Sequence, residues 1–195
     1  MPHIPPIPRE DLPQYEEFFA LIEGAMGFVP SSLRTMAHVP AVLDGFMALV
    51  PGVMLNPALS PELMNLVSHV TSNAAGCRYC QAHTAATAAN QGTDPEKLAA
   101  AWEFETSERF TDAERAALRL AFHAGVTPSA VTRDDFDALE RHYSTEEIVS
   151  IVAVISLFGW LNRWNDTMAT QLEDEPAIFA GAALADAGWE IGKHA

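Results

Sequence analysis

Residues 60–92 read SPELMNLVSHVTSNAAGCRYCQAHTAATAANQG. The stretch opens on Ser60-Pro61-Glu62, where a capping hydroxyl, a proline at the first helical position and an early acid together predict a helix start. Ala74-Ala75-Gly76 ends that helix just before Cys77. The alanine-rich residues that follow continue as a second helix until Asn90-Gln91-Gly92. Two helices joined at a glycine therefore form the predicted centre of the fold.

Working outward, the rest of the chain also has helical periodicity. We predict further helices over residues 12–26, 31–38 and 40–50, after Asp94-Pro95, after Thr111, and from Ser144 to about residue 163. Pro51-Gly52 is expected to break the third of these, and the Thr111 and Ser144 starts carry capping boxes. No stretch alternates with period two for long enough to predict a strand. The predicted fold class is all-α, a helical bundle.

The 195 residues fit one domain of ordinary size, and no linker divides them, so we predict a single domain over residues 1–195. Residues 1–10 are rich in proline and suit an extended arm. Residues 173–195 are interpreted as a peripheral helix or arm. The apolar run from Ile148 to Leu161 is shorter than the roughly 20 residues of a membrane span, so it predicts a core helix.

The content of apolar and charged residues indicates which kinds of molecule the chain can bind. Hydrophobic residues make up 49% of the chain and charged residues only 19%, which leaves apolar surface to bury between subunits and predicts a homo-oligomer. The formal net charge of −15 argues against nucleic acid and anionic membranes as partners. The N-terminal residues have neither a basic nor an apolar leader segment, so we expect a cytoplasmic protein.

Cys77 and Cys80 are the only cysteines. On one helix their Cα atoms lie about 5 Å apart, which is within the range that a disulfide accepts. Close cysteine pairs in reducing compartments are more often catalytic or metal-binding than structural. The helix start at Cys77 favours a thiolate there, and Arg78 adds positive charge. We therefore predict a pair in which one thiol attacks and the other resolves its sulfenic acid.

A histidine follows the pair on the same helix. His83 is expected about 5 Å from Cys80 and about 10 Å from Cys77, so it should serve Cys80 as base or proton donor. On the preceding helix Glu62, Asn65 and His69 share one face. If that face meets the cysteine helix, these three side chains supply a proton relay.

Other interpretations of the Cys77–His83 motif fit the sequence less well. A zinc site lacks a second ligand pair, and haem attachment requires a histidine where Gln81 stands. A thioredoxin-like motif requires a preceding strand. Two buried cysteines at chance spacing remain possible, and His69 by itself fits a hydrogen-bonded interior histidine. We expect no metal and no cofactor, and we interpret the polar cluster around Arg163 as structural or as an interface contact.

The motif resembles a known family. The run from Ser72 to Thr84 resembles the motif of AhpD-like proteins in the carboxymuconolactone decarboxylase superfamily. The stretch Glu146–Asp166, ending Leu-Asn-Arg-Trp-Asn-Asp, resembles the peroxidase-related branch. The resemblance implies an AhpD-like bundle assembled as trimers or hexamers. It also implies a hydroperoxide substrate, attack by Cys80 with Cys77 resolving, and reduction by an unidentified thiol or lipoyl-type donor.

The chain departs from the family pattern at three positions. The family histidine lies one residue later, at the position of Thr84 here, and the family relay glutamate corresponds to Asn65. Tyr79 stands where the family has a histidine. Glu62, one turn before Asn65, is the expected substitute for the relay acid.

These residues and the resemblance allow three functions. The first is a thiol-dependent hydroperoxide reductase acting through Cys77, Cys80 and His83. The second is a lactone decarboxylase or isomerase that uses His69 and His83 as acid and base. The third is an oligomeric redox protein without catalysis.

Overall fold

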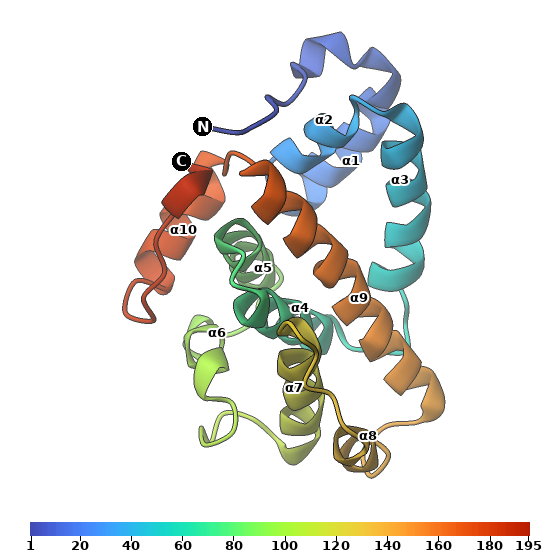
Figure 1. The fold of residues 1–195 in the computed structure, drawn as a ribbon, viewed down its shortest axis with the longest axis vertical. Helices are drawn as coiled ribbons and strands as arrows, with labels where there is room; N and C mark the ends of the chain where they lie inside the picture. The colour runs from blue at the N-terminus through green and yellow to red at the C-terminus, as the bar shows by residue number, and fades with distance from the viewer.

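The computed structural model describes all 195 residues and contains helices but no strand, which confirms the predicted all-α class (Figure 1). The α-helices are α1 (Glu16–Met26), α2 (Ser31–Met36), α3 (Pro40–Met54), α4 (Pro61–Ala75), α5 (Arg78–Asn90), α6 (Pro95–Ala99), α7 (Asp112–Gly125), α8 (Arg133–Leu139), α9 (Thr145–Met168) and α10 (Asp174–Ala183). Short 3₁₀ helices cover Arg9–Asp11, Pro13–Tyr15, Ala100–Glu103 and Gly192–His194.

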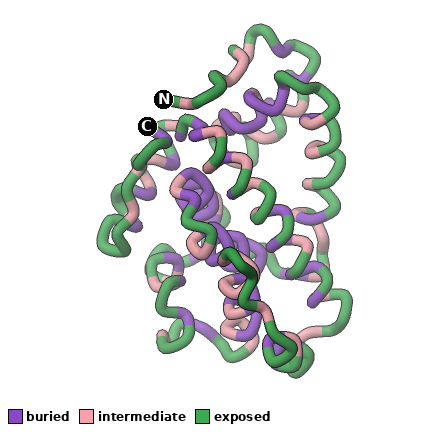
Figure 2. Tube along the Cα trace, viewed as in Figure 1, coloured by how far each residue is buried: buried purple, intermediate pink, exposed green.

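Helices α4 and α5 form the centre of the molecule. Every residue of α4 from Leu63 to Ser72 is buried, and the buried colour in Figure 2 concentrates on these two helices. Helix α4 packs against α5, α7 and α9. Helix α3 runs beside α9, and α1 and α2 lie near the C-terminal end of α9 (Figure 1). Burial of this many apolar side chains around one helix pair is the main source of the fold's stability.

The helix starts predicted from local chemistry are confirmed. The Ser60 hydroxyl accepts a hydrogen bond from the Leu63 amide at 3.2 Å, and Pro61 follows it at the first helical position. Thr111 and Ser144 each form a complete capping box. These caps satisfy amides that a helix leaves without partners at its N-terminus.

The observed helices differ from the prediction in several places. Helix α3 continues through Pro51 to Met54 instead of ending at Val50. Pro51 is exposed in the last turn, where solvent can hydrogen-bond the carbonyl that the proline leaves without a donor. Helix α9 continues to Met168 rather than ending near residue 163, and α8 was not predicted.

Residues 173–195, interpreted from the sequence as a peripheral helix or arm, contain helix α10 and contact the helix that carries the thiols. Helix α10 packs on α5, and Leu172, Ala180 and Leu184 lie in one apolar cluster with the two cysteines. Trp189 Nε1 donates to the Arg78 carbonyl at 3.1 Å. The small and apolar side chains of this segment allow close packing, so the segment covers the helix that carries the thiols.

Residues 1–8 form an N-terminal arm that leads to the first 3₁₀ turn at Arg9. The His3 amide donates to the carbonyl of Met168 at 3.0 Å, and the Ile7 amide donates to the carbonyl of Arg34 at 3.3 Å. The arm therefore lies against the C-terminal end of α9 and against α2.

Helix α9 is long and apolar enough to meet the length and composition of a membrane span. It nevertheless packs against α3, α4, α5 and α7 through buried residues that include Ile151, Val154 and Leu157. These residues belong to the main hydrophobic core of the molecule.

Candidate active site

The corner between α4 and α5 places Cys77 at a helix start. Gly76 closes α4 in the left-handed conformation with φ +72°, which a residue with a Cβ adopts at a cost. Cys77 then has extended backbone and is the N-cap of α5, and its Sγ accepts a hydrogen bond from the Cys80 amide at 3.5 Å. The sequence Ala-Ala-Gly-Cys therefore places the Cys77 sulfur at the N-terminus of α5, as predicted.

The two free thiols differ in acidity. A hydrogen bond from the Cys80 thiol lowers the pKa of the Cys77 thiol, and the Cys80 and Tyr79 amides lower it further against the opposing effect of burial. Burial raises the pKa of the Cys80 thiol well above its ordinary value, and the Cys77 sulfur adds to that shift. Deprotonation of the pair therefore occurs first at Cys77, which agrees with the helix-end argument.

The thiols also differ in what surrounds them. Cys80 lines a cavity of about 180 Å³, whereas Cys77 does not line it and is 0% exposed. The cavity wall comes from α1, α2, α3, α4, α5 and α9 and is largely apolar; the side chains include Phe18, Ile22, Met26, Phe46, Leu157, Phe158 and Leu161. A small apolar molecule in this cavity meets the Cys80 sulfur first.

Asn165 of α9 contacts the cavity thiol directly. Its Nδ2 donates to Cys80 Sγ at 3.4 Å, and this amide lowers the pKa of Cys80 against the larger effect of burial. The Oδ1 of Asn165 has no hydrogen-bond partner. The predicted role of the stretch around Arg163, structural or an interface contact, does not include this contact with Cys80. Two asparagines three residues apart on an apolar helix are a signal for it.

His83 faces the same cavity as Cys80 but makes no hydrogen bond to it. Its Nε2 lies 2.5 Å from Glu173 Oε2. The ring stacks on Tyr79 at 4.2 Å between centroids and meets the edge of Phe28 at 4.9 Å. The ring is thus fixed on three sides.

Glu173 is the site residue that sequence reasoning missed altogether. It is the N-cap residue of α10, in the segment interpreted as peripheral, and no local pattern marks it. Burial raises the pKa of its carboxyl, but the attraction of His83 and hydrogen bonds from His83 and the Ser31 amide outweigh burial and leave the pKa below its ordinary value. The carboxylate is therefore charged at neutral pH.

The predicted relay face of α4 is only partly brought to the thiols. Asn65 lines the cavity and donates through Nδ2 to Gln91 Oε1 at 2.9 Å. His69 is buried behind α5, where Nδ1 lies 2.9 Å from Thr84 Oγ1, and it borders a separate hollow with Trp102 and Trp189. His69 and His83 thus do not share a cavity.

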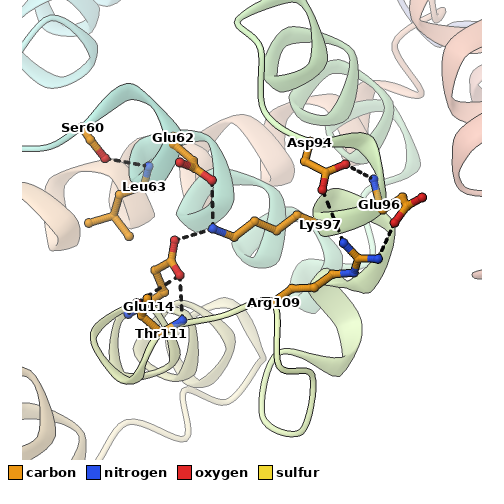
Figure 3. A network of polar contacts seen from close by, with 9 residues as sticks. All are labelled: Ser60, Glu62, Leu63, Asp94, Glu96, Lys97, Arg109, Thr111 and Glu114. Carbon is orange, nitrogen blue, oxygen red and sulfur yellow. Dashed lines mark hydrogen bonds and ion pairs between the residues drawn. The ribbon is translucent and has the colours of Figure 1, made fainter.

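Glu62 does not join the thiols, and the expectation that it replaces the relay acid is not met. Its carboxylate is half-exposed and binds Lys97 Nζ at 2.9 Å, and Lys97 also binds Glu114 at 2.7 Å (Figure 3). The capping turn at Ser60 directs Glu62 toward α6 and α7. No groups of His, Cys, Asp and Glu are arranged to hold a metal ion.

Comparisons with known proteins show which family the chain resembles in sequence and fold. Residues 40–123 match the carboxymuconolactone decarboxylase family. The debrominase Bmp8, solved without ligand and as a cysteine-to-alanine variant with 2,3,4-tribromopyrrole, is 36% identical, with a TM-score of 0.84 over 89% of this chain and 92–93% of that one.

Two further relatives are more distant. A peroxidase-related protein from Ralstonia eutropha JMP134 with an alkylhydroperoxidase AhpD core is 25% identical, with a TM-score of 0.76 over 89% of this chain and 94% of that one. The Escherichia coli K12 protein YnjA is 30% identical over 110 residues, which is 56% of this chain and 60% of that relative. Together with the helical architecture, these matches show that the chain belongs to the AhpD-like carboxymuconolactone decarboxylase superfamily.

Proposed function

We propose that the chain is a thiol-dependent reductase whose Cys77 and Cys80 cycle between dithiol and disulfide. The observation that carries the proposal is the placement of the two sulfurs. Cys80 lines an apolar cavity, and Cys77 lies behind it as the cap of α5. One thiol thus meets a substrate and the other is held where it can resolve the product.

The preferred substrate class is an organic hydroperoxide. The Cys80 thiol passes its proton to the Cys77 thiolate, and the Asn165 amide stabilises the new thiolate. A thiolate of high pKa is scarce but intrinsically more nucleophilic. It attacks the terminal peroxide oxygen, the O–O bond breaks, and the leaving alkoxide takes a proton from His83 to give the alcohol.

The second half of the cycle uses Cys77. Cys77, once it has lost its proton, attacks the sulfur of the Cys80 sulfenic acid, and the hydroxyl leaves as water. The sum is one hydroperoxide and two thiols giving one alcohol, one disulfide and one water. A monothiol or lipoyl-type dithiol donor then reduces the disulfide, and no cofactor is needed.

A second candidate is reductive removal of halogen from an aromatic ring. The similarity to the debrominase Bmp8 over most of both chains favours it, as does the aromatic and aliphatic cavity wall. In this reaction the Cys80 thiolate attacks the halogen, the ring carbon takes a proton, and Cys77 displaces halide from sulfur to form the same disulfide. Two electrons leave the thiols in either reaction.

The remaining functions have less support. Acid and base chemistry on a lactone requires His69 and His83 at one substrate, and they border different cavities. A redox protein without catalysis forms the disulfide but does not turn over with any donor. Neither requires the apolar cavity at Cys80.

Stopped-flow measurement of free thiol tests the proposal. Reduced protein is mixed with cumene hydroperoxide or, separately, with 2,3,4-tribromopyrrole, and dithiothreitol supports multiple turnovers. We expect two thiols lost per substrate in wild type and none in Cys80→Ser. Cys77→Ser should stop after one oxidation at a sulfenic acid that dimedone traps.

Equal thiol loss in wild type and Cys80→Ser contradicts the proposal. Decarboxylation of a carboxylated lactone that survives replacement of both cysteines supports the acid–base function instead. The ratio of the rates on the two probes decides between peroxide and halide chemistry.

A further inference from the structure

We infer that Glu173 is the positioning residue that orients His83 for proton transfer at the cavity. This inference rests on the proposed function. It assigns a part of the site to a segment more than 90 residues away from the cysteine motif, at the start of α10.

Three donors converge on the Glu173 carboxylate. His83 Nε2 lies 2.5 Å from Oε2, the Tyr79 hydroxyl donates to Oε1 at 3.1 Å, and the Ser31 amide also donates to Oε1. They come from α5 and from the start of α2, while Glu173 itself begins α10. The carboxylate therefore joins three segments at one point beside the cavity.

The only side chain that can form an ion pair with the Glu173 carboxylate is that of His83. The side chain of Glu173 is 14% exposed, and no lysine or arginine forms an ion pair with it. A buried carboxylate without a cation is costly unless donors satisfy it. The hydrogen of His83 Nε2 is thus held on the side of Glu173, as in other carboxylate–histidine pairs.

That bond leaves the second ring nitrogen for chemistry. His83 Nδ1 has no hydrogen-bond partner in the protein, and His83 lines the cavity together with Cys80. Stacking on Tyr79 and the edge contact with Phe28 prevent the ring from turning away. Nδ1 is therefore the atom that exchanges a proton with the substrate, while the Glu173 carboxylate holds the opposite ring nitrogen.

The first test measures the tautomer of His83 in the wild-type protein and uses a variant only to assign the signals. In ¹⁵N NMR spectra of histidine-labelled protein, with His83 assigned by loss of its signals in His83→Gln, neutral His83 should carry its proton on Nε2. A proton on Nδ1 with bare Nε2 overturns the inference, because a carboxylate cannot accept from a nitrogen that has no hydrogen.

The second test is kinetic. Glu173→Gln should lower kcat for cumene hydroperoxide about 100-fold, the loss typical of a disabled acid–base group, with KM changed by less than about twofold. Asp174→Asn is the matched control, since it removes the same charge from the adjacent exposed residue of α10. It should leave kcat unchanged.

A double-mutant cycle separates positioning from general support of the fold. In the His83→Gln background, Glu173→Gln should cause no further loss of kcat, since it acts through that ring. Full additivity of the two losses, or wild-type kcat in Glu173→Gln, overturns the inference. If Cys80→Ser keeps full activity, the proposed function itself fails, which is a different result.

Discussion

Cys77 and Cys80 are three residues apart, yet one lies at the start of a helix and the other on the wall of a cavity. Sequence reasoning left two assignments in conflict, because the helix end favoured Cys77 as the acidic thiol while the position of His83 favoured Cys80 as the attacking one. In the structure Cys77 is the more acidic thiol, whereas Cys80 is the thiol that lines the cavity. The more acidic thiol is therefore able to act as base for the accessible one.

Asn165 provides a test of how the Cys80 thiolate is stabilised. Asn165→Leu removes the amide that donates to Cys80 Sγ, and a hydrogen bond to a charged group contributes about 1.5–3 kcal/mol. We expect the rate of Cys80 alkylation by iodoacetamide, followed by mass spectrometry at neutral pH, to fall at least about tenfold.

Asn162→Leu is the matched control on the same helix. Its buried amide has no hydrogen-bond partner and so donates to neither sulfur; the alkylation rate should therefore stay at the wild-type value. Equal slowing in both variants contradicts a specific role for Asn165.

His69 predicts how stability depends on pH. Burial lowers its pKa from 6.5 to about 4, so between these values the unfolded chain binds a proton that the folded chain does not. The contribution of His69 to stability is thus complete above pH 6.5 and is lost as pH falls toward 4, by about 3 kcal/mol in total. Urea unfolding of wild type and His69→Gln should show a shallower decline in the variant; parallel curves contradict the prediction.

The candidate site could be predicted from sequence only where its residues are close in the chain. Cys77, Cys80 and His83 follow from helical spacing and a glycine that ends the preceding helix. Glu173 and Asn165 reach the site through tertiary packing of α10 and α9, which no local pattern encodes. Glu62 was placed on the right helix, but a lysine from α6 pairs with it and directs it elsewhere.

At the scale of elements, cap chemistry was the most reliable signal. Helices α4, α7 and α9 begin where a hydroxyl can accept from an amide three residues later. Pro51 predicts the end of α3 because proline is costly inside a helix. Its exposed position in the last turn of α3 lowers that cost, so the helix continues to Met54. Helix α8 has a capping box at Thr132 and only seven residues, too few to show periodicity.

The contact between α4 and α7 depends on Gly125. A Cβ there would lie 2.7 Å from the Cβ of Ala74 and 3.0 Å from the carbonyl oxygen of Thr71. Gly125→Ala should therefore lower the free energy of unfolding by about 1–3 kcal/mol, as overpacking typically does.

Gly45→Ala supplies the control for this change. Gly45 lies inside α3 with open space where a Cβ would stand, so alanine should be neutral or stabilise by up to about 1 kcal/mol. Chemical unfolding measures both variants. Equal stability of the two contradicts the close approach of α4 and α7.

On the scale of the whole molecule, α9 carries an apolar stripe that remains exposed. Val149, Val152 and Trp160 lie on one face of the helix and are among the exposed large hydrophobic residues. The low content of charged residues predicts a homo-oligomer, and the family resemblance implies a trimer or hexamer. This stripe is a surface on which a second copy can pack. That assembly remains a prediction.

Val152→Glu tests the predicted assembly. A charge in the middle of the stripe should dissociate the oligomer in sedimentation equilibrium at micromolar protein, while Gln171→Glu, at an exposed position away from the stripe, should not. A monomeric wild-type protein contradicts the prediction of an oligomer. Raising the salt concentration should strengthen association, because it screens repulsion between chains of net charge −15.

The fold class and the family could be predicted from the sequence because helical periodicity and the cysteine motif are local properties. The packing of residues 173–195 on α5 could not, since alanine-rich segments carry little directional information about their partner. Cytoplasmic location, the physiological donor and a single domain over residues 1–195 stay as predictions.

The capping of α5 by Cys77 has a consequence for electron transfer. Amides at the start of the helix hold an anionic sulfur better than the neutral sulfur of a cystine bridge. In a thermodynamic cycle of folding and oxidation, this preference favours the reduced form of the folded chain. The disulfide form of the native protein should therefore be a stronger oxidant than the disulfide form of an unfolded peptide of the same sequence. Its midpoint potential should move toward that of the peptide as α5 is destabilised.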